Sequence, residues 1–174
     1  MATTKKAAYT ESHKTRARTT STKKSHGTVK DVMAPRVVAV TSVTFLTEAA
    51  QIMKTEDVGA LPVVQEDGKL MGIVTDRDIT VRAVADNRDI RNTQVAEVFT
   101  AEELITVTPE MNLDEAEELM AEHQVRRLPV VDKGSNKLVG ILAQADIVRA
   151  KPQEAAEILK DISKPGGEHS QTKE

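Results

Sequence analysis

The sequence predicts an α/β fold made of two copies of a β-α-β-β-α unit that pack against each other. The first observation is an internal repeat, because Leu-Pro-Val-Val at residues 61–64 returns 67 residues later at residues 128–131. The second is that each copy holds a stretch with helical period, followed by two short β-branched runs joined by a turn. One such unit is too small to cover its own sheet face. Two units are therefore expected to pack together.

The amino-acid composition excludes several kinds of site and several classes of protein. The chain has 174 residues and no Cys, so disulfides and thiolate metal sites are excluded. Tyr9, Phe45 and Phe99 are the only aromatic residues, so the core must be aliphatic. No apolar run approaches the length of a membrane span, and the N-terminus lacks the apolar block of a secretory signal. We expect a soluble, cytoplasmic protein that makes no membrane contact.

Charge divides the chain into a basic arm and an acidic body. Residues 1–28 hold seven Lys or Arg and one acid, Glu11, although the net charge of the whole chain is -3. The arm is rich in Thr and Ser and has little to bury, which predicts a disordered, solvated tail. Two alternatives are contact with nucleic acid or another polyanion, and an organelle transit peptide. The arm lacks the interleaved aromatic residues that stack on nucleic-acid bases, which disfavours the first alternative. It also lacks the amphipathic apolar face of a transit peptide, which disfavours the second.

The repeat sets the expected domain boundaries. The disordered basic tail covers residues 1–28, the first unit residues 29–90 and the second unit residues 91–150. Residues 151–174 are expected to hold a short helix around Glu154–Ile162, which Pro165-Gly166-Gly167 ends, and a tail.

The first unit begins with a strand near Arg36–Val40. A helix follows, because apolar residues recur at i, i+3, i+4 and i+7; these are Leu46, Ala49, Ala50 and Met53. The strands Ala60–Gln65 and Lys69–Val74 flank a turn at Asp67-Gly68, which predicts a hairpin. Pro62 suggests that its strand starts late or lies at an edge. A second helix is expected over Asp76–Ala85.

The second unit repeats this order. Its first helix is expected to start after Asn112, with Glu115 at the matching capping position. The apolar residues of this helix are Leu113, Ala116, Leu119 and Met120. One residue is inserted between the two strands of the second hairpin, so the repeat spacing becomes 68. The last helix of the unit is expected over Gln144–Arg149.

The junction at the end of the first hairpin concentrates polar groups. Thr75 and Asp78 have the spacing of a capping box at a helix start. A helix N-terminus favours phosphate, and a carboxylate there can accept two hydroxyl hydrogens from a ribose. This stretch alone is also explained if Thr75 caps the helix, Asp78 complements the helix dipole and no ligand binds.

The matching junction of the second unit carries Ala143 and Asp146. Ala143 cannot cap, so we expect Asp146 to take no part in a capping box. Its presence has two explanations, a preference for acids at helix starts or contact with a ligand.

The ordered set of motifs, occurring twice, resembles the cystathionine-β-synthase (CBS) domain pair, or Bateman module. The motifs are the Leu-Pro-Val-Val strand, a Gly-centred turn, and Gly followed by two apolar residues, Thr-x-x-Asp and Ile. The resemblance covers nearly all of residues 29–150 and neither tail. It implies a regulatory module that binds adenosine-containing ligands in clefts between its two units, and that assembles as a homodimer.

The resemblance also implies which residues form the clefts. The first cleft would use Val40, Thr41, Ala60, Leu61, Pro62, Thr75, Arg77 and Asp78. The second would use Val107, Thr108, Leu128, Pro129 and Asp146. Arg126 and Arg127 stand where family members place cations towards phosphates, although surface solvation would explain them equally well. Because Ala143 departs from the motif, we expect the cleft with Thr75 and Asp78 to bind more tightly.

No pattern in the sequence indicates catalysis. No nucleophile stands beside a base, no Gly-rich phosphate loop occurs, and the four His residues lack metal-ligand spacing. We expect a non-enzyme without a catalytic cofactor or metal, which passes a signal to an unknown effector protein or through association. The ligand class includes ATP, ADP, AMP, NAD, S-adenosylmethionine and a cyclic dinucleotide. The alternative is a ligand-free dimerising scaffold whose basic arm contacts nucleic acid.

Overall fold

The structure is a computed structural model that describes residues 26–101 and 104–163. Its elements are, in chain order, α1 (Val29–Val32), α2 (Leu46–Thr55), β1 (Ala60–Val64), β2 (Leu70–Thr75), α3 (Asp76–Ile79), η1 (Thr80–Val84), η2 (Val95–Glu97), α4 (Leu113–His123), β3 (Arg127–Val131), β4 (Leu138–Ala143), α5 (Gln144–Ala150) and α6 (Ala155–Ile162). The stretch η1 is π-helical, whereas η2 is a single 3-10 turn.

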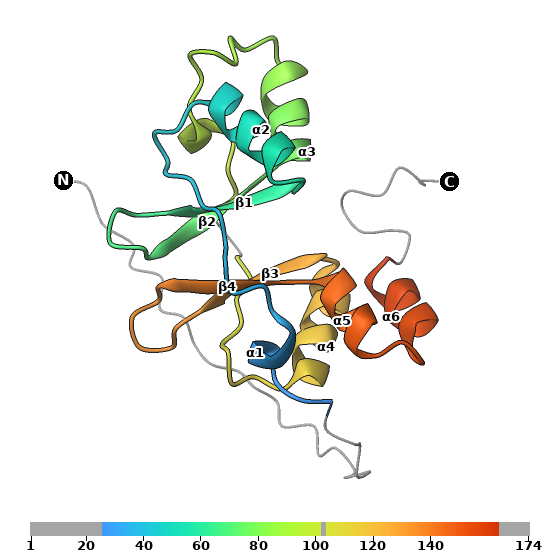
Figure 1. The fold of residues 1–174 in the computed structure, drawn as a ribbon. Helices are drawn as coiled ribbons and strands as arrows, with labels where there is room; N and C mark the ends of the chain where they lie inside the picture. Colours follow the sequence, from blue (N-terminus) through green and yellow to red (C-terminus); the bar gives the residue numbers. More distant parts are fainter. Residues whose placement is uncertain (1–25, 102–103, 164–174) are drawn as a thin grey trace, which may run out of the picture.

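The two repeats form two similar units whose hairpins face each other (Figure 1). The helices α2 and α3 lie on the outer side of one hairpin, and α4, α5 and α6 on the outer side of the other. Backbone hydrogen bonds join the hairpins near their turns. Leu70 donates to the carbonyl of Asn136 at 3.1 Å, and Leu138 donates to the carbonyl of Gly68 at 3.0 Å. The predicted fold of two related α/β units is confirmed.

Both predicted hairpins are present. β1 and β2 are antiparallel with Leu61 opposite Val74, and β3 and β4 are antiparallel with Leu128 opposite Leu142. Gly68 turns the first hairpin with φ of +84°, a conformation that a side chain disfavours. The strand ends fall within one residue of those expected because the turn and the β-branched runs are both local signals.

The long helices bury the predicted face with one exception. In α2, Leu46, Ala49 and Met53 are buried, whereas Ala50 is exposed at the border of this stripe, so its predicted burial is wrong. In α4 the buried residues are Leu113, Ala116 and Met120. Leu119 is partly buried against the same cluster. No helix within the described ranges is long and apolar enough to cross a bilayer.

Asn112 is the N-cap of α4, as its place before the helix predicts. Its side-chain oxygen accepts a hydrogen bond of 2.8 Å from the backbone of Asp114. The bond comes from the second helical residue, so Glu115 is not its donor. Either of these two donors satisfies a cap, since both backbone groups lack partners inside the helix.

The strand expected at the start of each unit is reduced to a single bridge. Val40 pairs in parallel with Val63, and Val107 pairs in parallel with Val130. Val40 donates to the carbonyl of Pro62 at 2.9 Å. Pro62 has no N–H to offer the strand beside it, so only a short pairing forms on that edge, in line with the edge position predicted for it.

The segment that leads into each repeat packs on the other repeat. Val29 of α1 lies in the core of the second unit, and Ala34 bridges to Ile141 of β4. In the same way Thr100, which follows η2, bridges to Ile73 of β2. Figure 1 shows α1 beside the helices of the second unit, although it is the first element of the chain. The two units are therefore bound together by exchanged segments.

Both ends of the described chain are attached to the second unit. Residues 26–28 belong to the segment predicted to be disordered, yet Gly27 accepts a backbone hydrogen bond of 3.1 Å from Leu113. That prediction is wrong for these three residues, because they pair with the start of α4; residues 1–25 lie outside the described range. The predicted C-terminal helix is confirmed as α6, which ends at Ile162. Pro165, which is expected to end it, lies outside the described residues.

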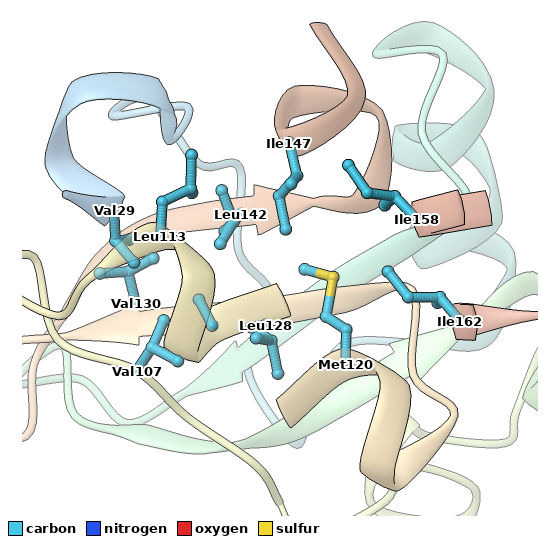
Figure 2. Packing of buried hydrophobic residues seen from close by; sticks show 11 residues of the cluster. Val29, Val107, Leu113, Met120, Leu128, Val130, Leu142, Ile147, Ile158 and Ile162 are labelled. Carbon is cyan, nitrogen blue, oxygen red and sulfur yellow. The ribbon is translucent and has the colours of Figure 1, made fainter. Parts of the chain in front are cut away.

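The helix α6 completes the second core. Ile158 and Ile162 are 1% and 2% exposed, and they pack in one cluster with Met120 and Ile147 (Figure 2). The first unit has its own cluster, centred on Leu61 and its neighbours from α2 and β2. Each unit therefore has an aliphatic core, as the shortage of aromatic residues predicts.

Candidate functional site

The junction between β2 and α3 forms a complete capping box. Thr75 Oγ1 accepts from the backbone of Asp78 at 3.1 Å, and Asp78 Oδ2 accepts from the backbone of Thr75 at 2.9 Å. The hydroxyl of Thr75 donates to the same carboxylate oxygen at 2.7 Å. This geometry confirms the predicted capping box. It also shows that both side chains already have partners inside the chain.

The other oxygen of Asp78 faces an arginine. Asp78 Oδ1 lies 3.6 Å from Arg82 Nε. The guanidinium of Arg82 is anchored elsewhere, since its Nη1 donates to the carbonyl of Val98 at 2.6 Å and to Thr100 Oγ1 at 3.2 Å. Arg82 therefore ties the first unit to the segment that leads into the second.

The junction between β4 and α5 keeps half of this arrangement. Ala143 has no hydroxyl, but its backbone N–H donates to Asp146 Oδ2 at 2.8 Å. The prediction that Asp146 takes no part in a capping box is thus wrong for one of the two bonds, because that bond needs only the backbone of Ala143. Asp146 Oδ1 accepts from Arg149 Nη2. The carboxylate is 13% exposed, whereas the Arg149 side chain is 72% exposed.

Asp146 lines a pocket of about 420 Å³ that lies between the two repeats. This volume is within the range of about 300 to 1,000 Å³ that small-molecule sites occupy. The wall from the first repeat and its leading segment consists of Ala34, Arg36, Val37, Val38, Glu56, Asp57, Val58 and Ala60. The wall from the second repeat consists of Arg127, Ile141, Ala143, Asp146 and Arg149.

The pocket combines an apolar wall with charges of both signs. Val37, Val38 and Val58 supply apolar surface, and Val38 and Val58 are exposed enough to contact a ligand, at 42% and 39%. Arg36 and Arg127 make no ion pair with any residue in the described part of the chain. Glu56 and Asp57 line the same pocket, so its charges are mixed, and the guanidinium groups of Arg36 and Arg127 offer contacts to an anionic part of a ligand.

Three of the residues that the resemblance implies meet in this pocket. They are Ala60, Arg127 and Asp146, which come from three different strand or helix ends. The structure places Ala60 with Asp146, whereas the resemblance groups it with Thr75 and Asp78. The leading segments cross between the repeats, so the wall opposite Asp146 is made by the first repeat.

The remaining implied residues lie outside this pocket. Thr75, Arg77 and Asp78 belong to the first junction, where Arg77 is exposed. Leu61 and Leu128 are 0% exposed, so their side chains fill the two cores. Of the others, Thr41 and Thr108 are partly exposed, Arg126 is exposed, and the buried residues are Val40, Pro62, Val107 and Pro129.

Among the residues missed by sequence reasoning, besides Arg149 of α5, are those before the first bridge and those before β1. Arg36, Val37 and Val38 precede Val40, while Asp57 and Val58 follow α2. No local motif marks them. They become site residues only because the segment from Ala34 onward crosses to the second hairpin.

The described residues offer no obvious metal site. Among residues 26–101 and 104–163, no group of three or more His, Asp or Glu side chains is placed to hold an ion.

Comparison with known proteins identifies one family. The family model of the CBS domain matches residues 29–84 and again residues 95–153. The CBS domain-containing protein YhcV of Bacillus subtilis is 45% identical over 137 residues, which span 78% of this chain and 94% of that protein.

Solved structures show the same fold. The CBS domain pair of protein MJ0100, in complex with 5′-methylthioadenosine and S-adenosyl-L-methionine, is 32% identical with a TM-score of 0.63 over 70% of this chain and 97% of that chain. CBSX2 from Arabidopsis thaliana, in complex with AMP, is 31% identical with a TM-score of 0.63 over 73% of this chain and 97% of that chain. Both repeats match the family model, and a relative at 45% identity matches over nearly its whole length. The chain therefore belongs to the CBS domain family and carries two CBS domains in tandem.

Proposed function

We propose that this CBS pair binds an adenosine-containing nucleotide in the pocket at Asp146 and works as a non-catalytic regulatory module. The observation that carries the proposal is the pocket itself. It joins a helix-start carboxylate, an apolar wall and two cations without ion-pair partners among the described residues, Arg36 and Arg127. These are the three kinds of group that a nucleotide needs.

Each part of a nucleotide has a complementary group. The apolar side chains of Val37, Val38 and Val58 suit the faces of a purine ring. The carboxylate of Asp146 suits the two hydroxyls of a ribose, since an ionised carboxylate accepts several hydrogen bonds. The guanidinium groups of Arg36 and Arg127 suit a phosphate, with which arginine forms paired hydrogen bonds.

The relatives support a ligand of this class. One structure of similar fold holds AMP, and another holds 5′-methylthioadenosine and S-adenosyl-L-methionine. All three compounds contain adenosine, and they differ in what the 5′ carbon carries. We expect this chain to recognise the adenosine part in the same way, and the cations of its pocket to determine which 5′ substituent binds.

The output of the module is also a proposal. Binding would act through a change in shape or association rather than through turnover. We propose a homodimer that passes the ligand signal to a partner protein. A ligand that bridges the two repeats would favour one relative placement of them, which is a direct way to affect a partner.

A thermal-shift panel tests ligand binding. The chain has no Trp, so the melt is followed with an extrinsic dye. AMP, ADP, ATP, NAD, S-adenosylmethionine and a cyclic dinucleotide are each added at millimolar concentration. A ligand at about 100 times its dissociation constant adds roughly 2.7 kcal/mol to the free energy of unfolding, which raises the melting temperature by several degrees.

A matched pair of variants shows where the ligand binds. Asp146→Ala should reduce the shift, whereas Asp86→Ala, an exposed acid outside the pocket, should leave it unchanged. A flat response to every compound with the wild-type protein would contradict the proposal. It would favour the alternative of a ligand-free scaffold.

A further inference from the structure

Both oxygens of the Asp146 carboxylate have partners within the chain. Oδ2 accepts from the backbone of Ala143 at 2.8 Å, and Oδ1 accepts from Arg149 Nη2. Arg149 lies three residues later on the short helix α5 and also lines the pocket. Each oxygen can accept a further hydrogen bond, but Arg149 already occupies one side of Oδ1, so a ribose hydroxyl that approaches Oδ1 from that side competes with the guanidinium.

Arg149 has fewer partners in the described chain than Arg82, the arginine that faces Asp78 in the first repeat. The Arg149 side chain is 72% exposed, and Asp146 is its ion-pair partner among the described residues. Arg82 also faces an Asp, but two further hydrogen bonds hold it to Val98 and Thr100. The position that matches Arg149 in the first repeat is Val81, so no cation stands there.

We propose that Arg149 determines the specificity of the Asp146 pocket by exchanging partners when ligand binds. In the empty pocket it neutralises Asp146. When ribose hydroxyls take Oδ1, the guanidinium turns to the 5′ phosphate, for which Arg36 and Arg127 of the same pocket supply further cations. This inference rests on the proposed function and names the class of ligand within it, a phosphorylated adenosine.

The exchange predicts discrimination by the 5′ substituent. A phosphorylated ligand replaces the ion pair with an equally strong, charge-assisted contact. Adenosine must break the same ion pair and offers Arg149 nothing in return, because its 5′ hydroxyl carries no charge. Arg149 then makes the pocket bind AMP more tightly than adenosine, in addition to any attraction of the phosphate by Arg36 and Arg127.

Calorimetric titration of AMP and of adenosine, each with three proteins, tests the exchange. The proteins are the wild type, Arg149→Gln and the control Arg91→Gln, in which an arginine with 84% exposure outside the pocket is changed in the same way. Arg149→Gln should weaken AMP binding about tenfold and strengthen adenosine binding several-fold. Both changes lower the ratio of AMP affinity to adenosine affinity. Arg91→Gln should leave both affinities unchanged.

The outcomes separate the inference from the proposed function. If the wild type binds AMP and Arg149→Gln weakens both ligands by the same factor or changes neither, the partner exchange is contradicted while the nucleotide site stands. If the wild type binds neither compound, the proposed function fails and the exchange fails with it. A gain for adenosine together with a loss for AMP cannot come from general damage to the fold, which would weaken both.

Discussion

Gly72 and Gly140 occupy matched positions in β2 and β4, where the leading segment of the other repeat passes close to the strand. A Cβ on Gly72 would overlap the carbonyl oxygen of Thr100 and come within 2.5 Å of the Phe99 ring. A Cβ on Gly140 would come within 2.5 Å of the sulfur of Met33. The nearest obstacle at Gly72 is a backbone oxygen, whereas the nearest at Gly140 is a flexible side chain, with the backbone oxygen of Ala34 further away at 3.2 Å.

Substitution of these two glycines should therefore give unequal effects. Gly72→Ala is expected to lower the free energy of unfolding by about 2 to 3 kcal/mol, and Gly140→Ala by about 1 kcal/mol, because Met33 can turn aside. Urea denaturation of both variants measures the difference. Equal losses would show that the exchanged segments do not lie against the strands as described.

Lys151 holds a buried group of charges together at the base of the second unit. Its side chain is 1% exposed, and its Nζ donates to Asp114 and, at 2.7 Å, to Glu117. Burial alone would lower the pKa of Lys151, but its hydrogen bonds to the two carboxylates outweigh burial and raise the pKa above 10.5. Burial alone would raise the pKa of Asp114, yet the bonds from Lys151 and His26 hold it below 3.8.

Removal of this lysine should cost more than removal of an exposed one. Lys151→Ala leaves two partly buried carboxylates without their cation, and the expected loss is about 3 kcal/mol. Lys160→Ala, on the exposed side of α6, should change stability by less than about 0.5 kcal/mol. Denaturant melts at neutral pH compare the two.

The same ion pairs set a pH dependence with a known sign. Because the pKa of Asp114 is lowered in the folded protein, its contribution is present above pH 3.8 and is lost as the pH falls through the lowered pKa. Because the pKa of Lys151 is raised, its contribution is present below pH 10.5 and is lost as the pH rises further. The difference in stability between wild type and Lys151→Ala should stay constant between these limits and shrink beyond them. A difference that grows below pH 3.8 would refute this assignment.

At the scale of elements, α6 is part of the second core rather than an appended tail. Ile158 is 1% exposed inside the core, and Leu159 beside it is 47% exposed. Ile158→Ala should therefore cost about 2 to 5 kcal/mol, and Leu159→Ala less than about 1 kcal/mol. Thermal or urea unfolding of the two variants measures these losses in the free energy of unfolding. Similar small losses for both would mean that α6 does not pack as described.

The sequence predicts those elements whose causes are local. The hairpins follow from turn residues and β-branched runs, and α2 and α4 follow from their 3.6-residue period. The capping box of Thr75 and Asp78 is likewise a local pattern. What the sequence does not predict is the exchange of the leading segments, because a repeat shows which stretches are alike and not which copy each one packs against.

The difference between local patterns and contacts of distant residues also explains which residues of the candidate site the sequence predicts. Asp146 and Arg127 stand in motifs and can be predicted, although the sequence wrongly indicates that Asp146 stays outside any capping arrangement. Arg36 and Asp57 carry no motif and enter the pocket only through contacts between residues distant in the chain. Sequence reasoning also misses Arg149, since an exposed arginine in a helix is ordinary until the structure places it against Asp146.

At the scale of the whole molecule, the helix faces of the first unit are more open than those of the second. Val81 and Val84 on η1 are 50% and 53% exposed, whereas α6 packs against α5 in the second unit. We expect a second copy of the chain to cover this face in a homodimer.

Light scattering tests the dimer. The wild type should have twice the chain mass at micromolar concentration, and Val84→Glu should shift it toward the monomer because a charge would be buried in the interface. Val43→Glu, at an exposed loop residue, should leave the mass unchanged. A wild-type monomer would contradict the expectation. Deletion of residues 1–25 should lower the mass only by the deleted residues and leave the number of chains in the assembly unchanged, since the predicted tail has little to bury.

Calorimetric titration of AMP into the wild type, Asp146→Ala and Asp78→Ala tests whether Asp146 lies in a nucleotide-binding pocket. Melting of each free variant first confirms that it is folded. We expect the wild type to bind AMP measurably. Asp146→Ala should lower the affinity about tenfold or more, or remove one binding event. Asp78→Ala reports on the other cleft, which the complete Thr75 motif predicts to be the tighter of the two. AMP binding that is unchanged by Asp146→Ala would contradict the account.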